Sequence, residues 1–241
     1  MTDQWVRASR PDPVIKANYI MPKRLQKSHL PITAQPVHIT YRLAGSIPRS
    51  EIKKVEEARD IKLAAFEREL ENVHDNQLRA KLTQKRNDIY TRSDLELDRL
   101  LHTIKSGPRH LAKREIWKLV ARSWHDLHIM QRVFVIAFCI MSNHVHVILK
   151  APANKDSVDS GKLMESHKGY TSRQANELLG TTGVPFWDSN YNDSTVRQGR
   201  FYTALWYVVN NPLQAGLVEH WRDWPATYVH PDCLAHLLPE E

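Results

Sequence analysis

The sequence predicts an α+β fold, in which an antiparallel sheet carries helices on one face. Residues 37–43 alternate apolar and polar side chains, a pattern typical of a half-buried strand. Residues 133–140 and 144–149 are apolar and β-branched, and the short polar turn between them predicts a buried hairpin. Apolar residues at spacings of three and four predict helices in the intervening segments. The predicted order is therefore strand, helices, two strands, helix, strand and helix.

The composition indicates a globular domain with a basic surface. The chain has 241 residues, of which 41% are hydrophobic, so one domain with elaborations can bury a sizeable core. Lys and Arg number 34 against 27 Asp and Glu, which gives a formal net charge of +7. This excess suits a polyanionic partner such as nucleic acid, although many ordinary soluble proteins are equally basic.

The cysteine content and the hydropathy indicate the cellular compartment in which the protein is expected. Cys139 and Cys233 are the only cysteines, which excludes both a disulfide framework and a cysteine zinc site and predicts a reducing environment. The sequence has no apolar segment long enough to span a bilayer and no apolar signal region at its N-terminus. We therefore expect a cytoplasmic protein.

The domain organisation follows from shifts in composition. We divide the chain into an irregular basic arm (1–35), a main domain (36–230) with a helical insertion (50–106), and a short tail (231–241). Within the insertion, Ser93 and Glu96 have the spacing of a capping box, which predicts that a new helix begins there. Residues 51–99 hold eleven basic and twelve acidic residues, so the insertion is expected to be a solvated spacer or a self-associating hairpin.

Two histidines on the second strand of the hairpin are the first candidate site residues. On a strand, side chains at i and i+2 face the same way, so His144 and His146 point together while Val145 and Val147 point into the opposite layer. Two imidazoles presented in this way can hold one metal ion. By themselves they fit equally well a hairpin with two partly buried histidines.

A helix near the C-terminus supplies the second half of the candidate site. Residues 199–211 predict an amphipathic helix, and Tyr207 lies on its polar stripe rather than its apolar side. Asn211 follows one helical turn later, where Cβ atoms are ~5–6 Å apart, so a hydroxyl and an amide oxygen can face one target. Because Pro212 comes next, Asn211 is equally interpretable as a helix cap.

These residues together suggest chemistry at a phosphodiester. A divalent ion held by His144, His146 and a third oxygen ligand would polarise the phosphate, and Tyr207 could then attack phosphorus while the 3′ oxygen departs. The product would be a 5′-phosphotyrosine bond. Such a bond conserves the energy of the phosphodiester, so the strand could later be rejoined.

Three motifs in the chain resemble those of a known family. They are Asn143-His144-Val145-His146 after an apolar strand, Phe186-Trp187 with Tyr191 and Asp193, and the segment 207–218 with its Tyr-Val-Val-Asn-Asn-Pro and Ala-Gly-Leu-Val. They resemble the REP-associated tyrosine transposases, which are single-tyrosine HUH transposases and endonucleases. The resemblance extends from about residue 37 to residue 224. Ser142 departs from the pattern, since relatives commonly have proline there.

The resemblance implies both a fold and an activity. It implies a ferredoxin-like (RRM-like) sheet, Mg²⁺ or Mn²⁺ on the histidine pair, and cleavage and rejoining of single-stranded DNA at palindromic repeat hairpins, with association with the nucleoid when DNA is bound. It assigns His144 and His146 as metal ligands, Asn211 as a third ligand and Tyr207 as the nucleophile. The chain could act as a monomer or a homodimer, with the site assembled in one chain or across two.

Several basic and aromatic side chains are candidates for contacting DNA. We select Lys168, Arg173, Trp187, Arg197 and Arg200, because cationic and aromatic groups track single strands. The same residues would serve a non-catalytic single-stranded nucleic-acid-binding protein, which is the main alternative function. A structural interpretation also remains, in which Trp187 and Trp206 belong to the core and the basic residues form a solvated surface.

Other metal-dependent or histidine-dependent enzymes fit the sequence less well. A histidine-triad hydrolase needs a third alternating histidine, but position 148 is Ile. A two-histidine phosphoesterase needs two His-x-Thr/Ser strands, and His38-Ile39-Thr40 has no second copy. A hydrolase that activates water on the metal stays open, although no Asp or Glu follows the histidine pair closely.

Overall fold

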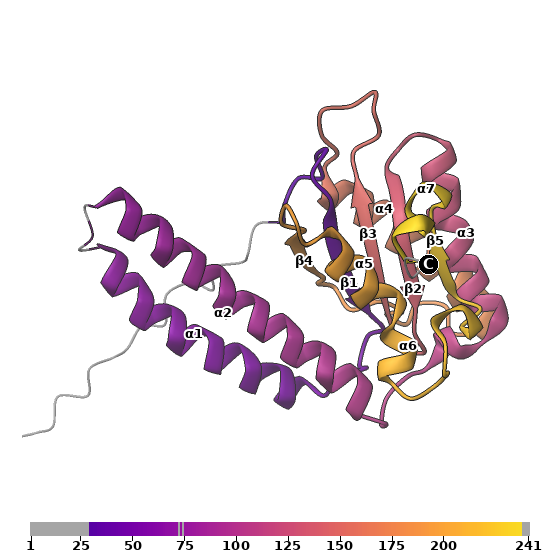
Figure 1. Ribbon diagram of the computed structural model, residues 1–241. Helices are drawn as coiled ribbons and strands as arrows, with labels where there is room; N and C mark the ends of the chain where they lie inside the picture. Colours follow the sequence, from indigo (N-terminus) through magenta and orange to yellow (C-terminus); the bar gives the residue numbers. More distant parts are fainter. Residues whose placement is uncertain (1–28, 72, 74, 238–241) are drawn as a thin grey trace, which may run out of the picture.

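A computed structural model describes residues 29–71, 73 and 75–237. Its centre is a five-stranded sheet in the order β4-β1-β3-β2-β5, with antiparallel pairing throughout (Figure 1). The strands are β1 (Val37–Arg42), β2 (Phe134–Ile140), β3 (His144–Lys150), β4 (Asn192–Thr195) and β5 (Thr227–Val229). The predicted first strand and the predicted central hairpin are therefore confirmed.

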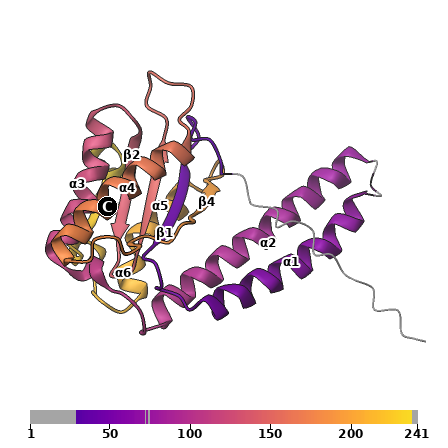
Figure 2. The ribbon, with the colours of Figure 1, turned by 180° about the vertical axis from the view of Figure 1, so that it is seen from behind.

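Two helices cover one face of the sheet, as the predicted fold class requires. They are α3 (Arg114–Ile129), which precedes β2, and α4 (Ser160–Leu179), which connects β3 to β4. Figure 2 shows both helices in front of the sheet when the molecule is seen from behind. The strand order 4-1-3-2 with these two crossovers is the ferredoxin-like arrangement, so the fold class is confirmed. Strand β5 extends the sheet beyond β2.

The face under α3 and α4 holds the larger hydrophobic core. Alternate residues of β1 and β3, such as Ile39 and Val147, point into it and are fully buried. On α3, Ile116, Val120 and Trp124 recur every four residues and are fully buried, which is why this helix lies flat on the sheet. The predicted separation of Val145 and Val147 from the two histidines follows from the same alternation.

The opposite face carries the C-terminal helices and a second core. Helix α5 (Phe201–Val209) packs on β2 and β3, placing Leu205 and Val208 against Ile136 and Ile148. The remaining short elements are α6 (Asn211–Gln214), α7 (Pro231–Leu234) and 3-10 turns at His110–Ala112, Trp221–Asp223 and Ala235–Leu237. Because α5 covers only part of this face, the sheet keeps room here for polar side chains.

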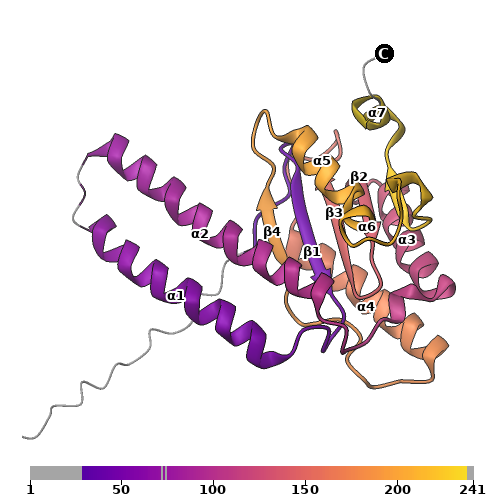
Figure 3. The same ribbon diagram turned by 60° about the horizontal axis from the view of Figure 1, so that its bottom comes forward.

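The insertion after β1 is a long helical hairpin that projects from the sheet domain. It consists of α1 (Arg49–Glu71) and α2 (Asn76–Thr103), which lie side by side in Figures 1 and 3. The prediction that a helix begins at Ser93 was wrong. Helix α2 runs through Ser93 without a break, and its cap is Asp75, whose side chain accepts a hydrogen bond of 2.7 Å from the Leu78 N–H.

Both predicted terminal segments are partly incorporated into the folded domain. Most of the predicted arm, residues 1–28, lies outside the described residues. Ile32, however, is fully buried and pairs with Val158 through backbone hydrogen bonds of 2.9 and 2.7 Å. In the predicted tail, Leu237 is buried in the second core. The folded unit therefore extends beyond 36–230 at both ends.

No helix within the described residues has the length and apolarity needed to cross a membrane.

Candidate active site

The two predicted histidines open strand β3 and face the partly covered side of the sheet. Both are fully buried. The Nδ1 of His144 donates a hydrogen bond of 2.7 Å to Asn143 Oδ1. The Nδ1 of His146 lies 3.0 Å from Thr40 Oγ1 and 3.2 Å from His38 Nε2. Because one nitrogen of each ring is held in this way, the rings are oriented and each Nε2 remains available at the centre of the site.

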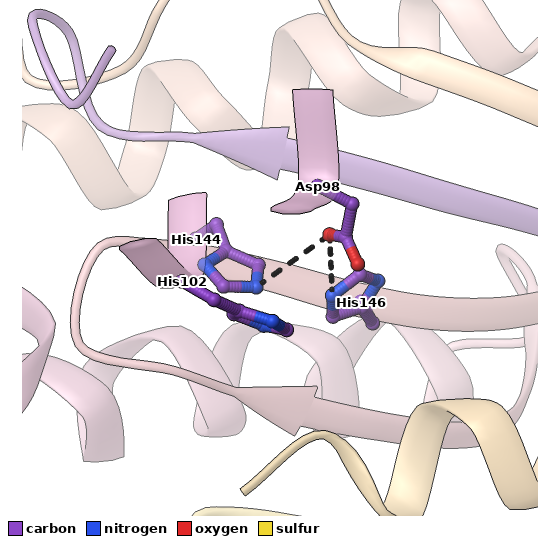
Figure 4. A group of neighbouring side chains, drawn as sticks. All are labelled: Asp98, His102, His144 and His146. Atoms are coloured by element: carbon purple, nitrogen blue, oxygen red, sulfur yellow. Dashed lines mark ion pairs between the residues drawn. The ribbon is translucent and has the colours of Figure 1, made fainter. Parts of the chain in front are cut away.

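Helix α2 of the insertion brings two further polar side chains to this pair (Figure 4). Asp98 Oδ1 lies 3.2 Å from His146 Nε2 and 3.8 Å from His144 Nε2. His102 follows one turn later, and its ring centroid is 5.3 Å from that of His144. One ligand atom from each of the four residues lies within 4.8 Å of all the others. This is the geometry of a candidate metal centre.

The last turns of α2 are fixed to the domain by apolar packing. Leu97, Leu100 and Leu101 are buried in a small cluster with Ile47. The turn between β2 and β3 adds a polar tie, since Asn143 Nδ2 donates a hydrogen bond of 2.9 Å to the Leu101 carbonyl. Asp98 and His102 therefore stand beside the histidines on a well-anchored stretch of helix.

The predicted nucleophile lies directly against this cluster. The Tyr207 hydroxyl donates a short hydrogen bond to Asp98 Oδ2. Its ring meets those of His146 and His38 edge to face, with centroids 5.6 and 5.8 Å apart. Burial raises the pKa of Tyr207 far above its usual value, and the negative charge of Asp98 raises it further. Without a cation at the site, the phenol therefore keeps its proton.

The charges around Asp98 explain its own ionisation. Burial alone would raise the pKa of its carboxyl, but the adjacent imidazoles of His146 and His144 and the hydrogen bond from Tyr207 outweigh burial, so the pKa lies well below its usual range. Burial lowers the pKa of His144 well below its usual value, and it lowers the pKa of His38 to about 3. Both rings are therefore neutral, which is the form that binds metals.

Asn211 is fully buried and turns its amide toward the same centre. Its Nδ2 donates a hydrogen bond of 2.8 Å to the Tyr207 carbonyl, one turn earlier. Burial lowers the pKa values of His102 and His144, and the Asn211 side chain acts weakly in the opposite direction, as an amide oxygen facing these rings does. The start of α6 has no side-chain cap, and its cap residue is Asn210. The Asn211 side chain therefore does not cap the start of α6, but its Nδ2 satisfies a carbonyl in the last turn of α5.

The donor atoms at the centre fit a divalent metal. Buried polar atoms nearly always have hydrogen-bond partners, because an unpaired one costs ~1–3 kcal/mol. Within the described residues, five buried atoms of this one site make no hydrogen bond: the Nε2 atoms of His102, His144 and His146, and the Oδ1 atoms of Asp98 and Asn211. Imidazole nitrogens and oxygens grouped in this way are the ligand types of first-row divalent ions.

A cleft of about 150 Å³ leads to the nucleophile between α2, α5 and the β1–β4 edge of the sheet. His38, Thr40 and Asn192 line it beside Tyr207 and Asp98. Asp94 and Asp193 lie in its wall, and among the described residues no Lys or Arg does. A phosphate that enters this cleft therefore meets negative charge, unless a cation offsets it.

The predicted DNA-contacting residues do not form one surface. The structure corrects the prediction that Trp187 contacts DNA. Its side chain is only 6% exposed and its Nε1 donates a hydrogen bond of 2.9 Å to Thr171 Oγ1, so the ring belongs to the core and cannot stack on bases. Lys168 and Arg173 lie on α4, across the sheet from the histidines. The Lys168 ammonium donates to the carbonyls of Asp188 and Ser189 at 2.7 and 3.1 Å.

The other two predicted residues lie on the side of the candidate site. Arg197 and Arg200 are exposed just before α5. Arg197 pairs with Asp88 of α2 at 3.1 Å. Trp206, on α5, is 38% exposed and is therefore not a core residue. The part of the chain from 197 to 206 thus offers exposed cationic and aromatic groups next to the nucleophile.

Sequence reasoning missed Asp98 and His102. Their spacing of four places them on one face of a helix, but that helix is densely charged and the pair has no other distinguishing signal. In the sequence, His38 and Thr40 match only an incomplete phosphoesterase motif. Their observed role is to orient His146.

Comparisons with known proteins agree with the motifs. Residues 103–211 match the family described as transposase IS200 like. A relative from Haemophilus influenzae, named as a REP-associated tyrosine transposase, is 27% identical over 119 residues, which is 44% of this chain and 64% of the relative's length. A solved structure of a REP-associated tyrosine transposase bound to a REP hairpin aligns with 88% of this chain and 86% of its own, at 13% identity and a TM-score of 0.49. The family match and the relative from Haemophilus influenzae confirm the resemblance found in the sequence.

Proposed function

We propose that this chain, which carries an IS200-like transposase segment at residues 103–211, is a metal-dependent single-strand DNA transposase and endonuclease. It cleaves and rejoins strands at palindromic repeat hairpins. One observation supports the proposal above the others: the hydroxyl of Tyr207 lies against a group of buried, unpaired metal-ligand atoms. A nucleophile and a candidate metal centre that adjoin in this way are what phosphoryl transfer to tyrosine requires.

The residues that hold the metal in this proposal are His144, His146 and Asn211. The cation, Mg²⁺ or Mn²⁺, supplies positive charge to a phosphate that would otherwise enter an acidic cleft. His38 and Thr40 fix the ring of His146 from behind. Burial keeps His144 in its neutral form by lowering its pKa, so the ring offers its nitrogen to the cation.

The covalent step is an in-line displacement. The Tyr207 oxygen attacks phosphorus and loses its proton, for which Asp98 Oδ2 is the adjacent acceptor. A bond forms between phosphorus and the tyrosine oxygen while the bond from phosphorus to O3′ breaks. O3′ leaves with the bonding electron pair and is protonated by solvent. The reverse attack by a 3′ hydroxyl rejoins the strand and releases Tyr207.

The substrate in this proposal is a single strand next to a DNA hairpin. Arg197 and Arg200 are the predicted residues best placed to contact it, because they are exposed beside α5. Lys168 and Arg173 could contact only DNA that reaches the α4 side of the sheet. We expect the protein to act in the cytoplasm on nucleoid DNA, as a monomer or a homodimer.

The proposal is tested by trapping the covalent intermediate. The full chain is incubated with a labelled single-stranded hairpin oligonucleotide and Mn²⁺, and the product is run on a denaturing gel. We expect an SDS-resistant adduct from the native protein and none from Tyr207→Phe or His146→Ala. An adduct that persists in Tyr207→Phe, or the lack of any adduct despite tight DNA binding, would overturn the proposal.

The second candidate function is a hydrolase that activates water on the same metal. Asp98 favours it, because it supplies beside the histidines the carboxylate that seemed to be missing from the sequence. The Tyr207→Phe variant separates the two functions. A hydrolase would keep turning over single-stranded DNA without this hydroxyl, whereas a transposase would lose all strand cleavage.

A further inference from the structure

We propose that the helical insertion is part of the active site, because its Asp98 ligates the metal ion through one carboxylate oxygen and holds the nucleophile through the other. His102, one turn later on α2, is a further ligand. The inference rests on the proposed metal at His144 and His146 and deepens it. The α1–α2 hairpin then becomes a component of the centre rather than a spacer.

The two oxygens of Asp98 have different surroundings. Oδ2 accepts the hydrogen bond from the Tyr207 hydroxyl. Oδ1 makes no hydrogen bond, although it lies 3.2 Å from His146 Nε2 and 3.8 Å from His144 Nε2. A carboxylate with one oxygen on the nucleophile and the other between two unpaired imidazole nitrogens is arranged to join the metal to the attacking group. It thereby fixes where the tyrosine oxygen stands relative to the cation.

A purely structural ion pair would leave this arrangement unexplained. Asp98 is 7% exposed, and both histidines are fully buried. Buried charges that serve stability are normally satisfied by hydrogen bonds on all sides, yet Oδ1 and both Nε2 atoms lie within ion-pair distance of one another without making a hydrogen bond. The Nε2 of His102 is unpaired as well. A cation between these atoms would satisfy all of them together.

The packing of α2 supports a fixed role. Leu97 comes directly before Asp98 and Leu101 three residues after it, and both are buried in a cluster with Ile47. Asn143, next to His144 in sequence, donates to the Leu101 carbonyl at 2.9 Å. Because the hairpin turn that presents the histidines is bonded to the helix that presents Asp98, the two halves of the centre are held in register.

The enlarged donor set also changes which metal the site prefers. His144, His146 and Asn211 provide two nitrogens and one oxygen, whereas Asp98 and His102 add one oxygen and one nitrogen. Mg²⁺ prefers oxygen ligands and retains several waters, while Mn²⁺ and later first-row ions accept imidazole readily. A centre with three imidazoles should therefore favour Mn²⁺ over Mg²⁺.

The test is a metal-binding measurement that does not depend on DNA cleavage. Binding of Mn²⁺ to the full chain is followed by titration calorimetry and by the electron paramagnetic resonance signal of free Mn²⁺. We expect Asp98→Asn to lower Mn²⁺ affinity by about tenfold to a hundredfold or more, and His102→Gln by about tenfold. His102→Gln should also narrow the preference for Mn²⁺ over Mg²⁺, because it removes an imidazole ligand.

A matched control comes from the same turn of the helix. Glu96→Gln also removes one negative charge from α2, but Glu96 points to solvent and pairs with Arg99. Its Mn²⁺ affinity should stay within about twofold of the native value, because a surface charge acts weakly at that distance. Circular dichroism and thermal unfolding without metal establish that each variant is folded.

The outcomes separate this inference from the proposed function. If the native chain and Asp98→Asn bind Mn²⁺ equally while His146→Ala does not bind it, the inference is wrong and the proposed metal site stands. If the native chain itself binds no Mn²⁺, the proposed function fails first. Should Asp98→Asn not fold, His102→Gln decides: unchanged affinity and unchanged metal preference overturn the role of α2.

Discussion

The two faces of the sheet each bury histidines, but they treat them differently. Under α3 and α4, His167 has both ring nitrogens bonded, to the Tyr41 hydroxyl at 2.7 Å and to Ser123 Oγ at 2.8 Å. On the other face, His144 and His146 have one nitrogen bonded and one unpaired. Burial is complete in both places, since the exposed fraction is 1% for His167 and 0% for the other two.

The difference shows how a structural histidine can be told from a candidate ligand. A buried imidazole that satisfies both nitrogens contributes to packing and specificity. Buried imidazoles that leave nitrogens directed at a common point cost stability unless something fills that point. The grouping of five such atoms around one point is therefore the physical mark of the site, and mutations at the two faces should have different consequences.

The largest expected effect comes from removing one buried histidine from each face in turn. His146→Ala should lower the yield of the covalent DNA adduct by about a hundredfold or more, because it removes a metal ligand. His167→Ala should instead lower the free energy of unfolding by about 1–3 kcal/mol, because it leaves buried hydroxyls unpaired. Gel analysis of the adduct and urea unfolding measure the two effects.

A reversed result would contradict this comparison of the histidines on the two faces. If folded His167→Ala forms no adduct, or if His146→Ala keeps the native yield, then hydrogen-bond satisfaction does not distinguish the two sites. The adduct yield is normalised to the folded fraction, so that loss of stability is not counted as loss of activity.

Acid should destabilise the metal-free protein through its buried histidines. Burial, with a smaller contribution from the charge of Lys168, lowers the pKa of His167 to about 3. In the unfolded chain a histidine has a pKa of ~6.5, so between these values the unfolded state binds a proton that the native state excludes. The free energy of unfolding should therefore fall as the pH is lowered from about 6.5 toward 3.

The share of His167 in this pH dependence can be isolated. His38, whose pKa is also lowered to about 3 by burial and the charge of His146, contributes with the same sign. In His167→Gln, urea unfolding at several pH values between 7 and 4 should show a shallower loss of stability than the native chain. Equal slopes for the two proteins would show that His167 is not held neutral by its surroundings.

The smallest expected effect concerns the exposed arginines on the two sides. Arg200→Ala, beside α5, should weaken binding of single-stranded DNA about two- to fivefold. It should also reduce the slope of log affinity against log salt concentration by about one. Arg173→Ala on α4 should have a smaller effect, since it lies across the sheet from the nucleophile. Fluorescence anisotropy at several salt concentrations provides the measurement. An equal or larger loss for Arg173→Ala would place the DNA on the other face.

The sheet and half of the site could be predicted because their signals are local. Alternation over 37–43 identified β1, and the i, i+2 spacing of His144 and His146 placed both on one face. The helical stripe placed Tyr207 on the polar side of α5. The regular repeat of side-chain directions in strands and helices is enough for such inferences.

The contribution of the insertion could not be predicted, because it depends on long-range docking. Asp98 is one of many charged residues in a helix whose apolar face is narrow. Only tertiary contacts bring it to histidines that are 46 and 48 residues away in sequence. The capping pattern at Ser93 gave a wrong prediction for a related reason. Ser93 lies in the middle of a continuous helix, where there is no helix terminus to cap. Burial of Trp187 depends in the same way on tertiary contacts, such as its hydrogen bond to Thr171, which its sequence position does not indicate.

The central claim is that the unpaired atoms on one face of the sheet surround a single metal ion. The most direct measurement is a crystal structure of the full chain grown with Mn²⁺, with anomalous diffraction locating the ion. We predict one peak within about 2–2.5 Å of the Nε2 atoms of His144 and His146 and of Oδ1 of Asp98. A bound ion elsewhere, or the same atoms paired with one another around an ion-free centre, would contradict the account.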